Sequence, residues 1–320
     1  MAGYLLKRLI ILFSSLFLVS LILFALLRLL PGDLAQIIAG TDADPQQVER
    51  LRVELGLNQS WLTQYWDWLS ALLRFDLGNS AVTGVPIAHE LWDKAGVTVP
   101  LAILGLLIAL LISYPLGTLR GIYNKSSLLS LCDSFFQALS YTPALWLGLI
   151  LIMLSAKGIG IFSIFPANGA NFTNFGQLIY ELFLPALTLA LVVSARLFRV
   201  QRVSVEEAKT SDFVRFGASL GYTRNQALVK YGIPTTLMPV VTTLTITFAQ
   251  MFTGVVVIEK LFVLPGIGTM LVNDLARRDL VKVQTELMFL TAVVLLLGVL
   301  VDVIGAVLDP RLRVGGTNNE

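Results

Sequence analysis

Residues 202–239 read RVSVEEAKTSDFVRFGASLGYTRNQALVKYGIPTTLMP and form the longest charged interval of the chain. Strongly apolar sequence lies on both sides of this segment. Its internal signals predict one short helix, a glycine turn and a second short helix. A short amphipathic helix pair between membrane spans is expected to present a docking surface to a soluble partner.

The first helix of this pair is predicted to begin at Ser211, which can cap residues 212–215. Asp212 places an acidic side chain in the first turn, where it favours the helix dipole. Gly221 follows at the position where a glycine with positive φ commonly ends a helix. The alternative is that the segment is only a solvated connector.

The second helix is predicted to begin at Thr223, because Gln226 three residues later completes a capping-box pattern. Its apolar face is expected to comprise Ala227, Leu228 and Tyr231. Pro234 is expected to stop this helix, since proline lacks the amide hydrogen that a helix interior requires.

The composition predicts a polytopic membrane protein. The chain has 320 residues, of which 56% are hydrophobic and 14% charged, with a net charge of +2. Its mean hydropathy is +0.78, and a soluble domain would carry about 25% charged residues. Cys132 is the only cysteine and His89 the only histidine, which excludes an intrachain disulfide and argues against cysteine or histidine metal clusters.

The first apolar run extends from Leu9 to Leu30, after the basic pair Lys7 and Arg8. A secretory signal is a poor fit, because the run is too long and no small-residue cleavage site follows it. A first transmembrane helix is the better interpretation, since about 20 apolar residues span the bilayer core.

A polar loop is predicted from Pro31 to about Gly96. Asp44, Pro45 and Gln47 are typical of a helix start. Ser60 is expected to cap a second loop helix whose apolar stripe comprises Trp61, Tyr65, Trp68, Leu69 and Leu72. Two interpretations of the stripe stay open: a helix at the membrane interface, or a small packed core outside the membrane.

Five further spans are predicted, which gives six in all. They cover residues 97–119, 132–154, 182–197, 238–258 and 287–308. The span at 132–154, the third of the six, is interrupted by Pro143, and the fourth, at 182–197, is short after Pro185. Membrane helices tolerate prolines where neighbouring groups satisfy the freed carbonyls.

The distribution of lysine and arginine favours an N-terminus in the cytoplasm. Residues 31–96 then form an extracytoplasmic loop, and residues 97–310 form the main permease domain. The charged segment, taken as residues 200–235, and a tail at 311–320 are then cytoplasmic. Arg277 and Arg278 oppose this orientation, because they lie in an outside loop.

Several chemistries are disfavoured. The chain has no phosphate-binding loop for ATP, and its Gly266-Ile-Gly268 is too short for a dinucleotide fingerprint. An intramembrane protease would need a Ser–His pair or facing aspartates within the spans. The predicted spans hold almost no carboxylates apart from Asp302, so no catalytic set is evident and an enzyme is not expected.

The order of weak motifs along the chain resembles the membrane permease subunits of ABC importers of the peptide/nickel type. The matching pieces are Pro31-Gly-Asp33, Val53-Glu-Leu-Gly-Leu57, Phe75-Asp-Leu-Gly78 with Ser80, Tyr114-Pro-Leu-Gly117, Tyr141-Thr-Pro-Ala-Leu-Trp-Leu-Gly148, Leu184-Pro-Ala-Leu187, Phe262-Val-Leu-Pro-Gly-Ile-Gly268, Arg278-Asp279, Asp302, Gly305 and Leu308-Asp-Pro-Arg311. The resemblance implies an all-α membrane protein of the type I importer kind, with extracytoplasmic loop helices and a cytoplasmic coupling helix pair.

In that family the cytoplasmic segment couples the permease to an ATP-binding subunit. The resemblance places this role on Arg202, Glu207, Asp212, Phe213, Arg215 and Gly221. The chain departs from the family pattern at residues 216–220, where small and basic residues are usual and this sequence has Phe-Gly-Ala-Ser-Leu.

The resemblance also implies the partners and the location. They are a second, similar permease, two ATP-binding subunits that bind the ATP, an extracytoplasmic solute-binding protein and the lipid bilayer of a bacterial inner membrane, with no nucleic acid and no cofactor of the chain's own. A peptide is the expected substrate; nickel, glutathione or an oligosaccharide are alternatives within the family. A secondary transporter is a rival class, but it would predict inverted repeats and ionisable residues in mid-span.

A polar stripe in the fifth predicted span is a candidate for the translocation path. Thr243, Thr247, Gln250 and Gly254 recur at a spacing that places them on one helical face. A glutamine at mid-span rarely faces lipid, which favours a protein or water environment. The alternative is helix packing, because threonine can bond its own helix backbone and glycine permits close approach.

Overall fold

The computed structural model describes residues 2–29, 34–39, 43–54, 56–156 and 175–308. Within these ranges every regular element is a helix, and the only β pairing is an isolated bridge between Asn79 and Pro86. The prediction of an all-α protein is therefore confirmed. Pro31-Gly-Asp33 and the predicted tail at 311–320 lie outside the described residues.

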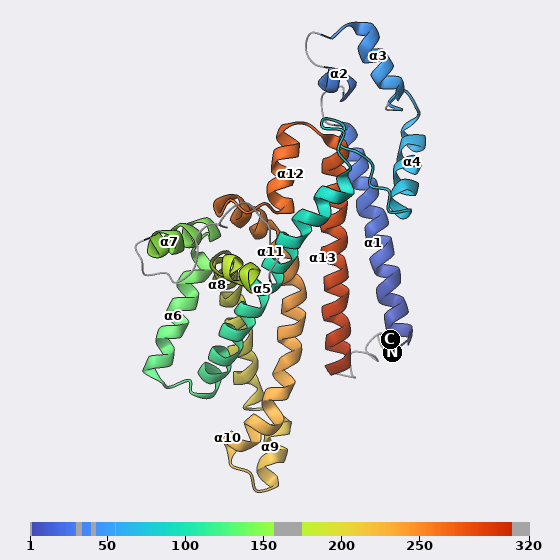
Figure 1. Ribbon diagram of the computed structural model, residues 1–320. Helices are drawn as coiled ribbons and strands as arrows, with labels where there is room; N and C mark the ends of the chain where they lie inside the picture. Colours follow the sequence, from blue (N-terminus) through green and yellow to red (C-terminus); the bar gives the residue numbers. More distant parts are fainter. Residues whose placement is uncertain (1, 30–33, 40–42, 55, 157–174, 309–320) are drawn as a thin grey trace. The chain divides into compact units, whose positions relative to one another are not determined.

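Five helical segments of the described chain are long and apolar enough to cross a membrane, and a bent helix pair would make a sixth span. The long helices, shown in Figure 1, are α1 (Ala2–Leu29), α5 (Ile87–Ile122), α8 (Phe175–Ala208), α11 (Leu237–Leu261) and α13 (Leu280–Leu308). Their order along the chain agrees with the predicted spans.

The third predicted span, residues 132–154, is broken at Pro143, as the sequence predicts, and the bend there is sharp. It consists of α6 (Ser127–Tyr141) and α7 (Ala144–Ala156), which are bent by 113° relative to each other. Thr142 between them has ψ 123°, an extended conformation. The cause is Pro143, whose ring disfavours a helical conformation at the residue before it.

The fourth span is much longer than predicted. Helix α8 has 34 residues and contains Pro185 in its interior, so it is about 51 Å long and exceeds the bilayer core. Hydropathy marks only the apolar middle of such a helix. Its polar last turns, which include Arg202 and Glu207, continue as helix to Ala208.

The chain divides into two compact units. One comprises Thr98–Pro265 and the described part of Leu297–Glu320; the other comprises Ala2–Val97 and Gly266–Leu296. In the first unit α5 packs closely on α8: a Cβ atom added at Gly117 would lie 2.9 Å from the carbonyl oxygen of Phe198. Phe136 of α6 also stacks on Phe198, with ring centroids 4.2 Å apart. Together these contacts fix α5 and α6 against α8.

The second unit contains α2 (Leu34–Ala39), α3 (Pro45–Glu54), α4 (Trp61–Leu73) and α12 (Ile267–Ala276) together with α1 and the first part of α13. The helix starts predicted in the polar loop are confirmed. An Asp44 carboxylate oxygen accepts from the Gln46 amide, and the Ser60 hydroxyl accepts from the Thr63 amide.

The predicted aromatic stripe of α4 faces two environments. Tyr65 and Leu69 are buried with Phe24 of α1, and the Tyr65 hydroxyl lies 2.9 Å from that of Ser20. Figure 1 shows α4 beside α1. Trp61 stays exposed, so the stripe combines a packed face on a membrane helix with an exposed aromatic edge.

Candidate functional site

The charged segment folds as two short helices at one end of α8 and α11 (Figure 1). They are α9 (Asp212–Ser219) and α10 (Arg224–Ala227). Gly221 lies between them with φ +90°, as the sequence predicts. Thr223 and Gln226 form the predicted capping box, with each side chain bonded to the other residue's backbone amide.

Ser211 occupies the N-terminal cap position of α9, but its side chain does not cap that helix. Its hydroxyl instead donates to the carbonyl oxygen of Ala208, at 2.7 Å. Ala208 is the last residue of α8, whose terminal carbonyls lack partners within the helix. The hydroxyl therefore closes the end of α8, and the predicted cap bond is wrong.

The prediction that Pro234 stops the second helix is also wrong. The chain continues from α10 through a π turn (Leu228–Gly232) and a 3₁₀ turn (Ile233–Thr236) directly into α11. The change of helical type accommodates Pro234, which lies at the start of the 3₁₀ turn, where a missing amide hydrogen costs little. Helix α10 is consequently continuous with a membrane helix.

A small apolar core holds the helix pair on the end of α8. Val214 of α9 and Ala227 and Leu228 of the second helix are buried together with Val205 and Ala208 of α8. Ala227 and Leu228 were predicted to form the apolar face, and Tyr231 is half-buried with its ring edge-on to those of Phe216 and Tyr222. Helices α9 and α10 are thus packed on α8, and α10 continues into α11.

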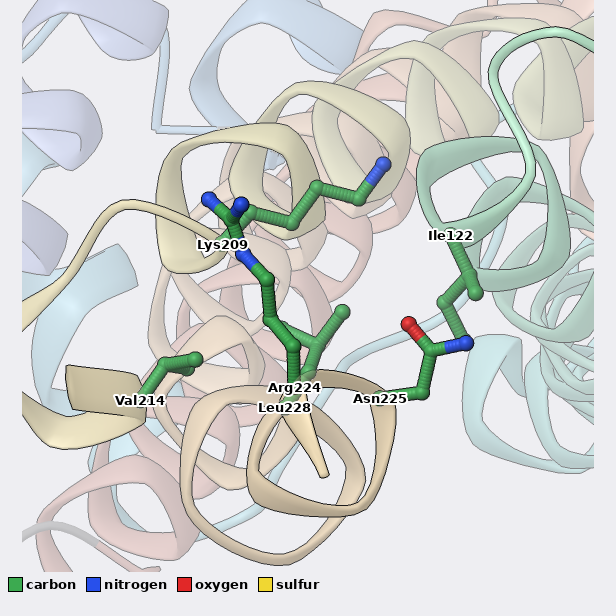
Figure 2. Close-up of a pocket in the computed structure, with 6 residues that line it drawn as sticks. All are labelled: Ile122, Lys209, Val214, Arg224, Asn225 and Leu228. Atoms are coloured by element: carbon green, nitrogen blue, oxygen red, sulfur yellow. The ribbon is translucent and has the colours of Figure 1, made fainter. Parts of the chain in front are cut away.

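A pocket of about 270 Å³ opens beside this core. Figure 2 shows Lys209 and Arg224 in its lining, with Ile122 and Asn225 opposite. Partial burial lowers the pKa of Lys209, and the positive charges of Arg224 and Arg120 act in the same direction against the opposing effect of Glu206. The pocket is therefore a positively charged recess.

A polar contact links the turn between α9 and α10 to the π turn that follows α10. The Lys230 ammonium donates to the Tyr222 hydroxyl at 2.5 Å and lies 4.5 Å from the centre of its ring. This hydrogen bond lowers the pKa of the Tyr222 phenol.

The outer side of α9 is apolar and exposed. Phe213, Phe216 and Leu220 are 43%, 58% and 55% exposed, although bulky apolar side chains are usually withdrawn from water unless they meet a partner. Two of these residues fall in the 216–220 segment that departs from the family pattern. Among the predicted coupling residues, Glu207, Asp212 and Arg215 are also exposed, and Arg215 donates to the Asp212 carboxylate at 3.3 Å.

Arg202 has a different environment from the other predicted coupling residues. Its guanidinium donates to Asp133 of α6 at 2.8 Å and to Glu206 of α8 at 3.1 Å. Asp133 also accepts from Arg120 of α5 at 2.6 Å. The Asp133 carboxylate thereby links α5, α6 and α8. Arg202 therefore makes its ion pairs within this chain.

The structure separates the predicted translocation stripe into two environments. Thr247 is 4% exposed, and a Cβ atom added at Gly254 would lie 3.4 Å from Leu189 of α8. The Thr243 hydroxyl donates to the carbonyl of Pro239, one turn back. Of the four residues only Gln250 is exposed, and its side-chain oxygen accepts from Arg196 of α8. The assignment of these residues to a path stays a prediction.

A buried charged cluster in the second unit is not among the features predicted from the sequence. Lys282 of α13 pairs with Glu90 of α5 and, at 2.9 Å, with Asp274 of α12. Ser80 donates to Asp279 at 2.5 Å across 199 residues of sequence. Both residues belong to motifs that carried the family resemblance, but nothing in their local sequence indicates that they meet.

Carboxylates just outside the predicted spans were also missed. Glu259 of α11 is fully buried and accepts a hydrogen bond of 2.6 Å from Thr98. Glu286 of α13 is fully buried close to Asp274. Both lie one residue beyond a predicted span boundary, and so hydropathy alone left them out.

Comparison with known proteins gives matches along nearly the whole chain. The family described as the inner membrane component of binding-protein-dependent transport systems matches residues 113–314, and the N-terminal family of the same membrane components matches residues 1–89. A protein of Brucella abortus (strain 2308), which carries the name of a peptide transport system permease, is 34% identical. The glutathione transport system permease protein of Escherichia coli (strain K12) is 30% identical. Each alignment covers 98% of this chain and 99% of the relative.

Proposed function

The chain belongs to the family of inner membrane components of binding-protein-dependent transport systems, and from this premise we propose that it is the permease of an ATP-driven importer of peptides. The coarser function follows from membership: the chain is a multi-pass membrane permease component and not an enzyme. A solute-binding protein and other subunits of the transport system accompany such a component. Full-length similarity to a protein named as a peptide permease carries the choice of substrate.

Coupling to ATP hydrolysis is proposed to act through α9 and α10. The exposed side chains Phe213, Phe216 and Leu220 supply an apolar surface for an ATP-binding subunit. The buried contact of Val214 with α8, together with the unbroken helical run from α10 into α11, supplies the mechanical link. A push or pull on this surface would tilt both membrane helices, which is how a soluble ATPase could drive alternating access.

The proposed complex contains a second permease and two ATP-binding subunits, which hold the ATP. Its proposed location is the bacterial inner membrane, with both termini in the cytoplasm. Glutathione is the alternative substrate that the similarity to the E. coli protein favours. Nickel and oligosaccharides remain alternatives from the family resemblance alone.

Affinity purification of the tagged chain from its native membrane tests this proposal. We expect two ATP-binding subunits and one further permease to co-purify in mild detergent, and a binding protein to join when its solute is present. Mass spectrometry of solute bound to that protein should identify peptides. Recovery of the chain alone, or with an ion-gradient partner only, would refute the ATP-driven importer.

The orientation is tested by reporter fusions. We expect fusions at Asp44 and Gln177 to report an extracytoplasmic location and a fusion at Arg224 to report a cytoplasmic one, because the basic residues near the helix pair favour the inside. Paired alkaline phosphatase and fluorescent-protein fusions measure this. A cytoplasmic signal at Asp44 would disprove the proposed orientation.

A further inference from the structure

Arg196 is an exposed arginine on a membrane helix. It lies on α8, and its Nη1 donates to the side-chain oxygen of Gln250 on α11 at 2.5 Å. Because an amide is neutral, this bond orients the guanidinium without cancelling its charge. The other N–H groups of Arg196 make no hydrogen bond with the described residues that pack around it, so an edge of the guanidinium stays available.

The pair lies within two helical segments that are long and apolar enough to cross a membrane, Gly176–Ala208 and Arg224–Leu261. Gln250 is near the centre of the 25-residue helix α11. Two contacts fix the register of α8 against α11: Leu189 of α8 lies at Gly254, and Gln201 of α8 bonds Thr236 at 3.1 Å. Arg196 and Gln250 meet between these two contacts. An arginine within a membrane-spanning segment is costly when it faces lipid, and such residues almost always face protein or water. The exposed face around Arg196 is thus expected to line an aqueous or subunit-facing surface.

Arg199 extends the positive charge by one turn of α8. It is also exposed, and its Nη2 donates to the neutral hydroxyl of Ser140 at 3.3 Å. Neither Arg196 nor Arg199 forms an ion pair with a carboxylate among the described residues. Arg202 on the same helix has two carboxylate partners, Asp133 and Glu206. The chain neutralises Arg202, the arginine nearest the helix pair, and leaves Arg196 and Arg199 without a carboxylate partner among the described residues.

We propose that Arg196, positioned by Gln250 and followed by Arg199, binds a carboxylate group of the transported solute. A guanidinium presents paired N–H donors that match the two oxygens of a carboxylate, and such charge-assisted bonds are roughly twice as strong as neutral ones. The solute class is one with a free carboxylate, such as the C-terminus of a peptide. The inference rests on the proposed transport function, which it deepens by naming the group that is recognised.

The test compares trialanine with trialanine amide, which lacks the terminal carboxylate, in proteoliposomes containing the complete transporter. The readout is the ratio of ATP-dependent uptake of the acid to that of the amide. The binding protein is identical in every sample, so its own preference cancels when a variant is compared with the parent. We expect Arg196→Gln to lower this ratio about tenfold, a typical loss for one charge-assisted hydrogen bond.

Three further variants separate an effect of the charge from an effect on the fold. Arg196→Lys keeps the charge and should retain most of the ratio, while Gln250→Leu frees the guanidinium and should lower it partly. Arg74→Gln removes an exposed positive charge at the end of α4 and should leave the ratio unchanged.

The outcomes are distinct. An unchanged ratio in an assembled Arg196→Gln transporter overturns the inference while leaving peptide transport intact. Loss of assembly in both Arg196→Gln and Arg196→Lys would mean that the arginine serves the subunit interface, which also overturns it. If the parent transporter takes up neither probe, the peptide function fails and the inference fails with it.

Discussion

Replacing Gly221 by valine is expected to abolish ATP-driven uptake while leaving membrane insertion intact. Gly221 has φ +90°, which a residue with a branched side chain adopts at a cost of roughly 1–2 kcal/mol. A Cβ atom added there would meet nothing within 4 Å, so the penalty comes from the backbone and not from a clash. The turn must then change, and with it the relative placement of α9 and α10.

The measurements are transport, the abundance of the variant in the membrane and the amount of ATP-binding subunit that co-purifies. Gly221→Asn is the matched control, because asparagine tolerates positive φ better than other residues with side chains. It should retain much more uptake than Gly221→Val. Equal, normal uptake in both variants at normal abundance would show that this turn does not couple the permease to an ATPase.

The sequence was sufficient to predict elements whose signals are local. Apolar segments marked the five long helices and the bent pair α6 and α7, and Thr223 with Gln226 marked the start of α10, because hydropathy and capping act within a few residues. Local signals gave the wrong result where a residue had two possible structural roles. The Ser211 hydroxyl donates to the last residue of α8 and does not cap α9. Pro234 does not end the helical run, because the chain changes there to a π turn and a 3₁₀ turn.

The candidate site was predictable in position but not in its contacts. Gly221 and the apolar face of the second helix follow from short-range patterns, whereas the partners of Arg202 lie on a helix about 70 residues earlier as well as on its own. Similarly, Gln250 was singled out by its spacing, but its bond with Arg196 depends on the register between α8 and α11. A single sequence contains no direct record of such tertiary pairs.

The buried cluster around Lys282 leads to the second prediction with a large effect. Replacing Lys282 by methionine should strongly destabilise the unit formed by residues 2–97 and 266–296. The Lys282 side chain is 6% exposed and pairs with both Asp274 and Glu90. The change keeps an apolar chain of similar length but leaves the Asp274 carboxylate, itself 6% exposed, without its cation. Removal of one partner from a buried ion pair typically costs about 3–5 kcal/mol.

The expected result is a fall of several degrees in the unfolding temperature of the purified complex, together with faster external proteolysis of residues 43–73. Lys94→Met on α5 is the matched control, because the partly exposed Lys94 forms no ion pair with the described residues; its change should stay within about 0.5 kcal/mol. Adding Asp274→Asn to Lys282→Met should recover part of the loss, since it removes the uncompensated charge. If the double variant is no more stable than Lys282→Met alone, the charge pair does not stabilise this unit, and the cost arises from packing around the lysine chain.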